Sequence, residues 1–338
     1  MDRVYVRPIV QVDVSRPSDA QTLGGGWGWF THVELLRRDA APEIVAADTL
    51  DPKELAQLTA PRGPIAGLSL ERPRIMGILN TTPDSFSDGG QHEGAERAVA
   101  GALAMLEAGA DMIDVGGEST RPGAETVDPD VEIRRTAPII AELRAAGTKA
   151  GISIDTRKAT AAQAALDAGA NLINDVSGFT YDAELASLAA RSGAPVCVMH
   201  AHGDPATMQK DPQYGDVLLD VYDFLEGQIA VLEDAGVARS LIVADPGIGF
   251  GKTQAHNLTL LARLSLYHSL GVPLLLGASR KRFIGTISGA EVADQRAPGS
   301  IAVALAGISQ GVQFVRVHDV GQTKQAISLW QASIKGRV

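Results

Sequence analysis

Short runs of β-branched residues and leucine recur along most of the chain, and alanine-rich stretches with helical periodicity separate them. Such runs, bounded by turn-forming residues, predict buried β-strands. We expect eight strands, at Ile75–Leu79, Met112–Val115, Gly151–Ile154, Leu172–Ile173, Pro195–Met199, Leu241–Val243, Val272–Leu276 and Gln313–Val317. Eight helices are expected at residues 95–108, 129–144, 159–168, 182–191, 216–234, 256–263, 300–309 and 323–334. Strand and helix therefore alternate.

Two of the helix-to-strand junctions have nearly the same sequence. The chain reads Ala-Gly-Ala-Asp-Met-Ile around Gly109 and Ala-Gly-Ala-Asn-Leu-Ile around Gly169, and in both the glycine suits the left-handed backbone that ends a helix. Repetition of this unit, with strands apolar enough for a parallel sheet buried on both faces, predicts an α/β protein, a (β/α)8 TIM barrel. An open, doubly wound sheet is the alternative. Against it, no Gly-x-Gly-x-x-Gly follows the first strand, and polar sequences follow most strands.

Residues 1–63 lack this alternation and are interpreted as an N-terminal extension, with the barrel spanning residues 64–338. A glycine-rich stretch at 24–30 holds two of the three tryptophans, and Pro-Arg-Gly-Pro at 61–64 is typical of a linker. Such an aromatic patch either binds a ligand through its rings or packs against the barrel, and we favour packing. Residues 66–70 are expected to form a short strand that closes the barrel floor, the end where the strands begin.

Composition and charge narrow the class of protein. With 45% hydrophobic but only 4% aromatic residues, the 338-residue chain predicts one large aliphatic core. The net charge of −10 disfavours nucleic-acid binding. The chain begins without an apolar leader and has no run of the ~18 apolar residues that a membrane span needs, so we expect a cytoplasmic protein. The single cysteine, Cys197, lies in an apolar run, which excludes a disulfide framework and predicts a small core residue.

Polar and glycine-rich sequences follow most predicted strands, and the βα loops of a closed barrel all meet at one end. The first such loop spans residues 80–90. Its Asn80 amide either faces a metal or a phosphate-bound water or begins an Asx-turn, and the local sequence does not decide between them. The second loop contains Thr120, Arg121 and Pro122, and the guanidinium fork suits a phosphate or a carboxylate. We therefore expect a ligand site at the carboxyl ends of the strands.

Small polar side chains end three of the predicted strands. Asp155 follows the third strand, Asn174 the fourth and Asp245 the sixth. Because a buried polar group costs ~1–3 kcal/mol when unpaired, each of them needs a partner. Each alone is also suited to cap the next helix, Asp155 above all. Together, two carboxylates and an amide suit the donor-rich edge of a flat heterocycle.

The later loops add an aromatic ring and a run of cations. Phe250 lies between two glycines that let the backbone approach closely, a feature that core packing does not require. Ser279 and Lys281 follow the seventh strand and are candidate site residues. Their neighbours Arg280 and Arg282 are expected to be solvated surface cations.

A second pair of cations ends the eighth strand. Arg316 and His318 alternate there, so both point to the same side and suit an anion. Together with two cations in earlier loops, they are the candidates to hold an anionic ligand: Arg121, Lys281, Arg316 and His318. A zinc site is not expected, because histidines such as His200 and His202 have no carboxylate or cysteine at matching spacing.

Taken together, the loop sequences resemble those of the dihydropteroate synthase family. The resemblance rests on Met-Gly-Ile-Leu-Asn-Thr-Thr-Pro-Asp-Ser-Phe-Ser-Asp-Gly-Gly at 76–90 and Gly-Glu-Ser-Thr-Arg-Pro-Gly-Ala at 117–124. It continues through 153–156, 173–176, 245–251, 279–281 and 316–319. It implies a (β/α)8 barrel, usually a homodimer, that condenses 6-hydroxymethyl-7,8-dihydropterin pyrophosphate with p-aminobenzoate and releases pyrophosphate. Residues 1–63 lie outside it.

By motif position, the resemblance implies a role for each candidate residue. The pterin would be bound by Asp155, Asn174, Asp245 and Lys281, with Met199 packing beside it. Magnesium (Mg2+) and pyrophosphate would be held with the help of Asn80, and the anion would be bound by Arg121, Arg316 and His318. The p-aminobenzoate would be surrounded by Phe86, Thr120, Pro122, Phe250 and Ser279. The residues expected to carry catalysis are Asp155, Asp245, Lys281 and Arg121.

One loop departs from the family pattern, and two other functions are considered. After the fifth strand the family often has His-Met-Gln-Gly, where this chain has His-Ala-His-Gly at 200–203. A pterin-dependent methyltransferase would share the pterin residues but lack the loop sequences at 82–90 and 120–123. A non-catalytic pterin-binding protein would show damage in the first loop or among the anion-binding residues. Both are disfavoured, because these sequences are intact.

Overall fold

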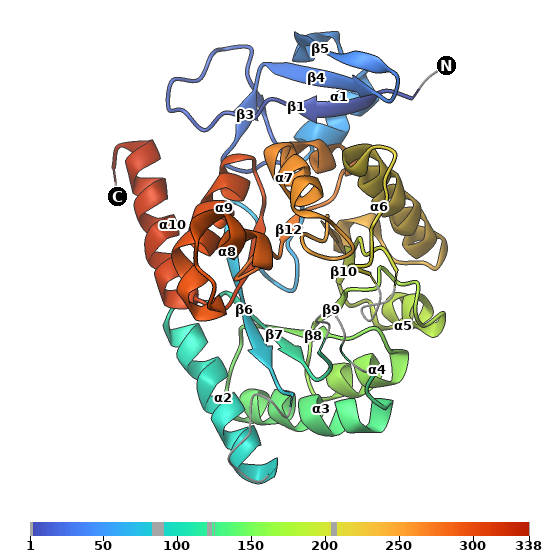
Figure 1. Ribbon diagram of the computed structural model, residues 1–338, viewed down its shortest axis with the longest axis vertical. Helices are drawn as coiled ribbons and strands as arrows, with labels where there is room; N and C mark the ends of the chain where they lie inside the picture. Colours follow the sequence, from blue (N-terminus) through green and yellow to red (C-terminus); the bar gives the residue numbers. More distant parts are fainter. Residues whose placement is uncertain (1–2, 83–90, 120–123, 125, 204–207, 338) are drawn as a thin grey trace.

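Eight parallel strands form the centre of the molecule, and helices surround them (Figure 1). The computed structural model describes residues 3–82, 91–119, 124, 126–203 and 208–337. The strands are β6 (Arg74–Asn80), β7 (Met112–Gly116), β8 (Gly151–Asp155), β9 (Leu172–Asp175), β10 (Val196–Met199), β11 (Ile242–Asp245), β12 (Leu275–Leu276) and β13 (Phe314–Val317). Their order in the sheet is β11-β10-β9-β8-β7-β6-β13-β12.

One parallel bridge closes this sheet into a barrel. Ala244 in β11 pairs with Leu274, directly before β12, and the Ala244 N–H donates to the Pro273 carbonyl at 2.9 Å. The predicted (β/α)8 barrel is therefore confirmed, and the open doubly wound sheet is wrong. The strand predicted at 272–276 shortens to β12, because Pro273 has no N–H to donate to a ladder.

Several strands extend further at their carboxyl ends than the apolar runs predicted. Gly116, Asp155, Asp175 and Asp245 all belong to their strands. Ladder hydrogen bonds join backbone groups and do not depend on the polarity of the side chain. A strand predicted from hydrophobic residues alone is therefore too short where polar residues continue the strand.

In the described part of the chain, a helix lies at each of the eight predicted positions, with bounds that differ by a few residues. They are α2 (Gln91–Glu107), α3 (Pro129–Ala145), α4 (Ala159–Asp167), α5 (Glu184–Ser192), α6 (Val217–Asp234), α7 (Gln254–Ala262), α9 (Ala297–Ser309) and α10 (Val320–Lys335). The sequence did not predict α8 (Arg282–Ser288) or the 3-10 helix η4 (Leu264–Leu270). Both span only 7 residues, too few to establish a helical period.

A tight turn closes the barrel floor. Ala66 and Gly67 have φ angles of 49° and 79°, and Ile65 and Leu68 exchange two backbone hydrogen bonds. The strand expected at 66–70 is therefore wrong, because left-handed residues reverse the chain. The turn packs with inward-pointing strand residues in one apolar cluster: Ile65, Leu70, Met76, Met112, Leu172, Cys197, Val243, Leu275 and Phe314. The interpretation of the cysteine as a core residue is confirmed.

Residues 3–60 form a small unit on one side of the barrel, beside η4, α6 and α9 (Figure 1). Strands β1 (Tyr5–Pro8), β4 (His32–Arg37) and β5 (Ala40–Ala46) make an antiparallel sheet, β2 (Gln21–Thr22) pairs with β3 (Trp29–Phe30), and α1 (Pro52–Thr59) follows. This unit has its own core, formed by Val6, Leu23, Phe30, Val33, Ala47 and Leu58. The division into an extension at 1–63 and a barrel at 64–338 stays a prediction.

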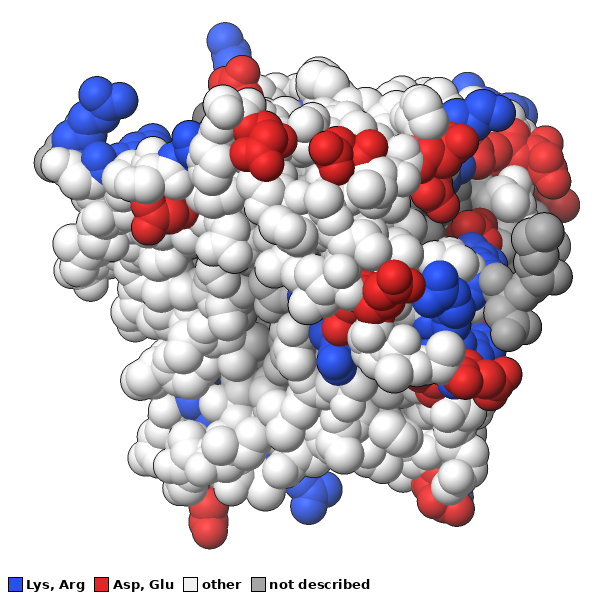
Figure 2. Space-filling model, turned by 90° about the horizontal axis from the view of Figure 1, so that it is seen from above, with Lys and Arg blue, Asp and Glu red and all other residues white. Residues whose placement is uncertain are grey.

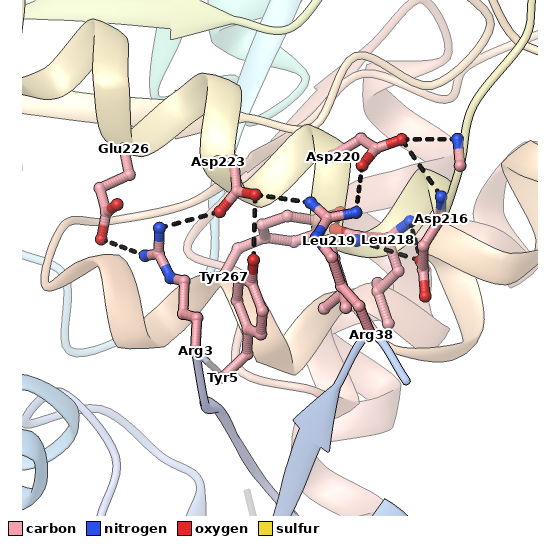
Figure 3. A network of polar contacts seen from close by, with 11 residues as sticks. Arg3, Tyr5, Arg38, Asp216, Leu218, Leu219, Asp220, Asp223, Glu226 and Tyr267 are labelled. Carbon is pink, nitrogen blue, oxygen red and sulfur yellow. Dashed lines mark hydrogen bonds and ion pairs between the residues drawn. The ribbon is translucent and has the colours of Figure 1, made fainter. Parts of the chain in front are cut away.

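Ion pairs join the extension to α6. Arg3 lies 2.9 Å from Asp223 and 2.6 Å from Glu226 (Figure 3). Arg38 lies 2.6 Å from both Asp220 and Asp223. Exposed ion pairs contribute only ~0–1 kcal/mol each to the free energy of folding. We therefore infer that these pairs mainly orient the extension on the barrel.

Aromatic side chains make the second contact between the two parts. The Trp27 indole N–H donates to the Ile308 carbonyl in α9 at 2.9 Å, and its ring packs beside the apolar residues of α9. The Tyr5 ring lies edge-on to Tyr222 of α6, with centroids 5.3 Å apart. Packing of the aromatic patch against the barrel, as the sequence suggested, is confirmed for Trp27.

The face that carries the extension shows charged residues in small mixed groups (Figure 2). Lys and Arg lie beside Asp and Glu, and broad uncharged areas separate the groups.

Among the helices of the described residues, none has the length and apolar character needed to cross a bilayer.

Deletion of residues 1–63 tests the role of the extension. We expect a lower Tm, because the deletion uncovers the apolar surface of α9 that Trp27 covers. Turnover per folded molecule should change by less than about two-fold, because the extension's ion pairs and ring contacts go to α6 and α9 and to none of the predicted site residues. Calorimetry and activity normalised to the folded fraction measure both. Arg38→Ala is the control and should shift Tm by only ~2 °C. An equally stable but inactive truncation would instead place the extension in catalysis.

Candidate active site

Polar side chains from neighbouring strands lie level with one another at the carboxyl ends of the barrel. In the sheet register, Asp155 of β8 lies opposite Asn174 of β9, and Met199 of β10 lies opposite Asp245 of β11. All four residues are buried. Strand pairing thus brings together residues that are far apart in the sequence.

The guanidinium group of Arg316 lies between two carboxylates. Its Nε donates to Asp114 Oδ2 at 2.6 Å, and its Nη2 donates to Asp155 Oδ2 at 2.7 Å. Asn174 Nδ2 also donates to Asp114 Oδ2, at 3.2 Å. These four side chains come from β13, β7, β8 and β9, so the polar layer links strands across the barrel mouth.

Asp114 was not among the predicted site residues. It is fully buried, and its Oδ1 has no hydrogen-bond partner among the described residues. The signal was present in the sequence, because an acid inside an apolar strand requires a buried partner. A search confined to residues that follow the apolar runs passes over it. Asp114 is therefore a further carboxylate of this site.

The helix-cap alternative for Asp155 is wrong. The residue that caps α4 is Lys158, without a side-chain hydrogen bond, whereas the Asp155 carboxylate bonds Arg316. Burial raises the pKa of Asp155 to about 7, although the nearby Arg316 charge opposes the shift. Asp155 thus titrates near neutral pH rather than in the usual acidic range.

Asp245 is buried and Lys281 is partly buried, and both have pKa values near neutral pH. Asp245 Oδ1 accepts a hydrogen bond from the Gly247 N–H at 2.7 Å. Burial raises the pKa of Asp245 to about 6 and lowers the pKa of Lys281 to about 8. The Lys281 ammonium lies 4.0 Å from the centroid of the Phe250 ring. Both groups can therefore change protonation with a small change in surroundings, as is typical of functional sites.

The loop after β11 passes close to the loop after β10. Gly247 has a φ of 68°, and a Cβ at this position would lie 1.9 Å from the His200 carbonyl oxygen, so only glycine fits. Beside these loops lies a cavity of about 240 Å³. It is lined by residues from the loops after β8, β9, β10 and β11, among them Arg157, Val176, Tyr181, Met208 and Phe250.

Ser279 and His318 form a hydrogen-bonded pair, with His318 Nδ1 3.0 Å from Ser279 Oγ. Burial, together with the Arg316 charge, lowers the pKa of His318 to about 4, so its ring is neutral at pH 7. The expectation that Arg280 is a solvated cation is wrong. It lies 2.6 Å from Asp319, because that acid follows the neighbouring strand β13. Arg282 is exposed, as expected.

The remaining predicted site residues give less information. Four of them lie outside the described residues: Phe86, Thr120, Arg121 and Pro122. Asn80 ends β6, and its side chain is exposed. Within the described ranges, no three His, Cys, Asp or Glu side chains are grouped to hold a metal ion.

A closed barrel with carboxylates, an amide and a lysine at one mouth defines the class of protein, a TIM-barrel enzyme with its ligand site on the βα loops. The family model of pterin binding enzymes matches residues 76–318. The dihydropteroate synthase of Escherichia coli (strain K12) is 44% identical over 270 residues, which cover 80% of this chain and 95% of that protein. The chain belongs to the family of pterin-binding enzymes that includes the dihydropteroate synthases.

Solved structures give the same relationship. Xanthomonas albilineans dihydropteroate synthase with 4-aminobenzoic acid matches with a TM-score of 0.75 and 45% identity, covering 81% of this chain and 98% of that one. The same enzyme in complex with 7,8-dihydropteroate matches with a TM-score of 0.72 and 43% identity, over the same shares of both chains.

The raised pKa of Asp245 predicts how stability depends on pH. Its pKa is about 6 in the folded protein against an ordinary value of 3.8, so between these values the folded state binds the proton more tightly. The free energy of unfolding should therefore fall as pH rises from about 4 to about 7. Asp245→Asn should show a smaller fall, since the raised pKa of Asp155 still contributes, and should exceed the unchanged protein at pH 8 by ~1–3 kcal/mol.

Urea denaturation at pH 5 and pH 8 measures this difference. Asp234→Asn, at the exposed end of α6, is the matched control and should leave the pH dependence unchanged. An Asp245→Asn variant with the same pH dependence as the unchanged protein would show that Asp245 is ionised throughout this range.

Proposed function

We propose that this protein condenses 6-hydroxymethyl-7,8-dihydropterin pyrophosphate with p-aminobenzoate, forming 7,8-dihydropteroate and releasing pyrophosphate, as a dihydropteroate synthase of folate biosynthesis. The observation that carries the proposal is the polar group of Asp155, Asn174 and Asp245, buried at the carboxyl ends of β8, β9 and β11, with both carboxylates close enough to Lys281 to act on its pKa. Membership of the family supports the same activity.

The pterin is assigned to the polar side chains of Asp155, Asn174 and Asp245 at the strand ends. A pterin presents an edge of N–H donors and a carbonyl, and carboxylates accept paired N–H bonds whereas an amide both donates and accepts. Asp155 and Asp245 serve as acceptors, Asn174 serves in both senses, and Met199 packs on the flat face. Because their pKa values lie near 7 and 6, these carboxyls are ready to ionise when N–H donors of a ligand replace the missing solvent.

The chemistry is a displacement at the exocyclic methylene of the pterin. The bond from this carbon to the pyrophosphate oxygen breaks, and positive charge develops on the carbon and the attached ring. The buried carboxylates stabilise that charge. The amine nitrogen of p-aminobenzoate forms the new bond and loses a proton. No protein nucleophile is needed, because positioning of the two substrates supplies the main advantage.

The leaving pyrophosphate is assigned to the cationic side of the site. Arg121, Arg316 and His318 are the proposed anion-binding residues, and the neutral His318 ring contributes a donor rather than a charge. Asn80 would be the protein ligand of Mg2+, which, when bound, neutralises charge on the pyrophosphate. An exposed amide at a strand end fits this ion, because Mg2+ usually takes few protein ligands and is completed by phosphate and water.

The arylamine is assigned to the space next to Lys281. Phe250 and Ser279 lie there, and Phe86, Thr120 and Pro122 belong to the same proposed subsite. A homodimer in the cytoplasm is part of the proposal and rests on the family resemblance alone.

Pyrophosphate release with both substrates tests the proposed function. We expect release to require both the pterin pyrophosphate and p-aminobenzoate. Asp245→Asn and Lys281→Ala should each lower kcat/KM by about 100-fold or more while the circular dichroism spectrum is retained, because both side chains lie at the barrel mouth. Asp234→Asn is the control. Release that is independent of p-aminobenzoate, or wild-type rates in both variants, would contradict the assignment.

The anion-binding assignment is tested by comparing two variants. Arg316→Ala should weaken both pyrophosphate and 6-hydroxymethylpterin by about ten-fold or more, because its guanidinium also bonds Asp155. His318→Ala should weaken pyrophosphate by about three- to ten-fold and leave the pterin unchanged. Calorimetric titration with each ligand in the presence of Mg2+ measures both. Equal loss of both ligands in His318→Ala would remove His318 from the anion subsite.

A further inference from the structure

Lys252 follows the loop after β11, and its amine is buried. Its Nζ lies 2.9 Å from the Gly247 carbonyl oxygen, 3.0 Å from that of Phe250 and 3.3 Å from that of His200. The same atom lies 2.7 Å from His200 Nδ1. Only 3% of the residue is exposed. One amine therefore holds the backbone of two βα loops at once.

This arrangement is unusual for a lysine. Lysine is almost never fully buried unless it is paired, and here the amine lies within hydrogen-bonding distance of carbonyl oxygens and a ring nitrogen rather than of a carboxylate. Burial lowers the pKa of Lys252 to about 7. Even a neutral amine keeps two N–H donors, so carbonyl bonding survives in either protonation state. The role that fits is bonding to the backbone rather than charge pairing.

The backbone that Lys252 holds is the loop of residues 246–251. This loop carries Phe250, whose ring lies against Lys281 at 4.0 Å. From outside, the loop is bonded by Gln209, which donates to the Gly249 carbonyl at 2.6 Å, and by Tyr214, which donates to the Gly251 carbonyl at 2.7 Å. Lys252 makes the corresponding bonds from inside, at the carbonyl of Phe250 itself.

We propose that Lys252 is a positioning residue that fixes the loop of residues 246–251, and thereby sets the place of the Phe250 ring over Lys281 and the affinity for the arylamine substrate. The proposal rests on the proposed function for its kinetic part. The pterin subsite depends less on Lys252, because Asp155, Asn174 and Asp245 are held by strand pairing. Lys252 should therefore affect the two substrates unequally.

Lys252→Met tests this, because methionine keeps the length and apolar stem of the side chain but removes its donors. We expect the KM for p-aminobenzoate to rise about ten-fold, with kcat and the KM for the pterin pyrophosphate within about two-fold of the unchanged enzyme. A purely structural residue would lower Tm and the active fraction without separating the two KM values.

Arg144→Met is the matched control. Arg144 also bonds three backbone carbonyls, those of Thr148, Ala150 and Gly169, at 2.8, 2.8 and 2.9 Å, but it does so where β8 and β9 begin. This variant should lower Tm and leave both KM values unchanged. If Lys252→Met does not fold, Lys252→Gln replaces it, and its amide donors should give a rise of about three-fold in the KM for p-aminobenzoate.

Two results would overturn the proposal. One is an unchanged KM for p-aminobenzoate in the folded variant, and the other is an equal rise of both KM values. A crystal structure of the folded variant separates this failure from that of the proposed function. Displacement of Phe250 from Lys281 supports the positioning role even if the unchanged protein forms no dihydropteroate, and an unmoved ring refutes it.

Discussion

The rest of the site depends on one ion group, the partly buried guanidinium of Arg316 between the buried carboxylates of Asp114 and Asp155. A buried carboxylate is costly without a partner, and two of them at one barrel mouth also repel each other. Arg316 offsets both effects and links β13 to β7 and β8. The acidic group of side chains that receives the ligand is therefore possible because a cation from the last strand crosses the barrel.

The two ends of the barrel are built for different tasks. The floor is an apolar cluster closed by the turn at Ala66 and Gly67, and the extension packs beside α9 through Trp27. The mouth holds charges, glycines and close backbone contacts, as at Gly247. Because the two ends are separate, the apolar floor stabilises the fold while the mouth holds buried charged side chains that lower its stability.

The titration behaviour of the site follows from its burial. Asp155, Asp245 and Lys281 have pKa values of about 7, 6 and 8, each displaced toward the uncharged form by loss of water. A site that has already lost its water does not need to reorganise when charge develops on a ligand. Burial of these groups also has a cost, because the free energy of unfolding declines as the pH rises toward neutrality and the buried carboxyls ionise.

The alternation of strand and helix, the barrel, and the strand-end positions of Asp155 and Asn174 can be predicted from the amino-acid pattern, because burial and local turn chemistry leave periodic patterns. The chain also displays the family loop sequences. Which side chains contact one another follows from the folded barrel alone. The partner of Arg316 inside β7, the pairing of Arg280 with Asp319 and the contact of Lys252 with His200 depend on neighbours far away in the chain. Local periodicity shows that a residue is buried, but the closed sheet determines what lies across from it.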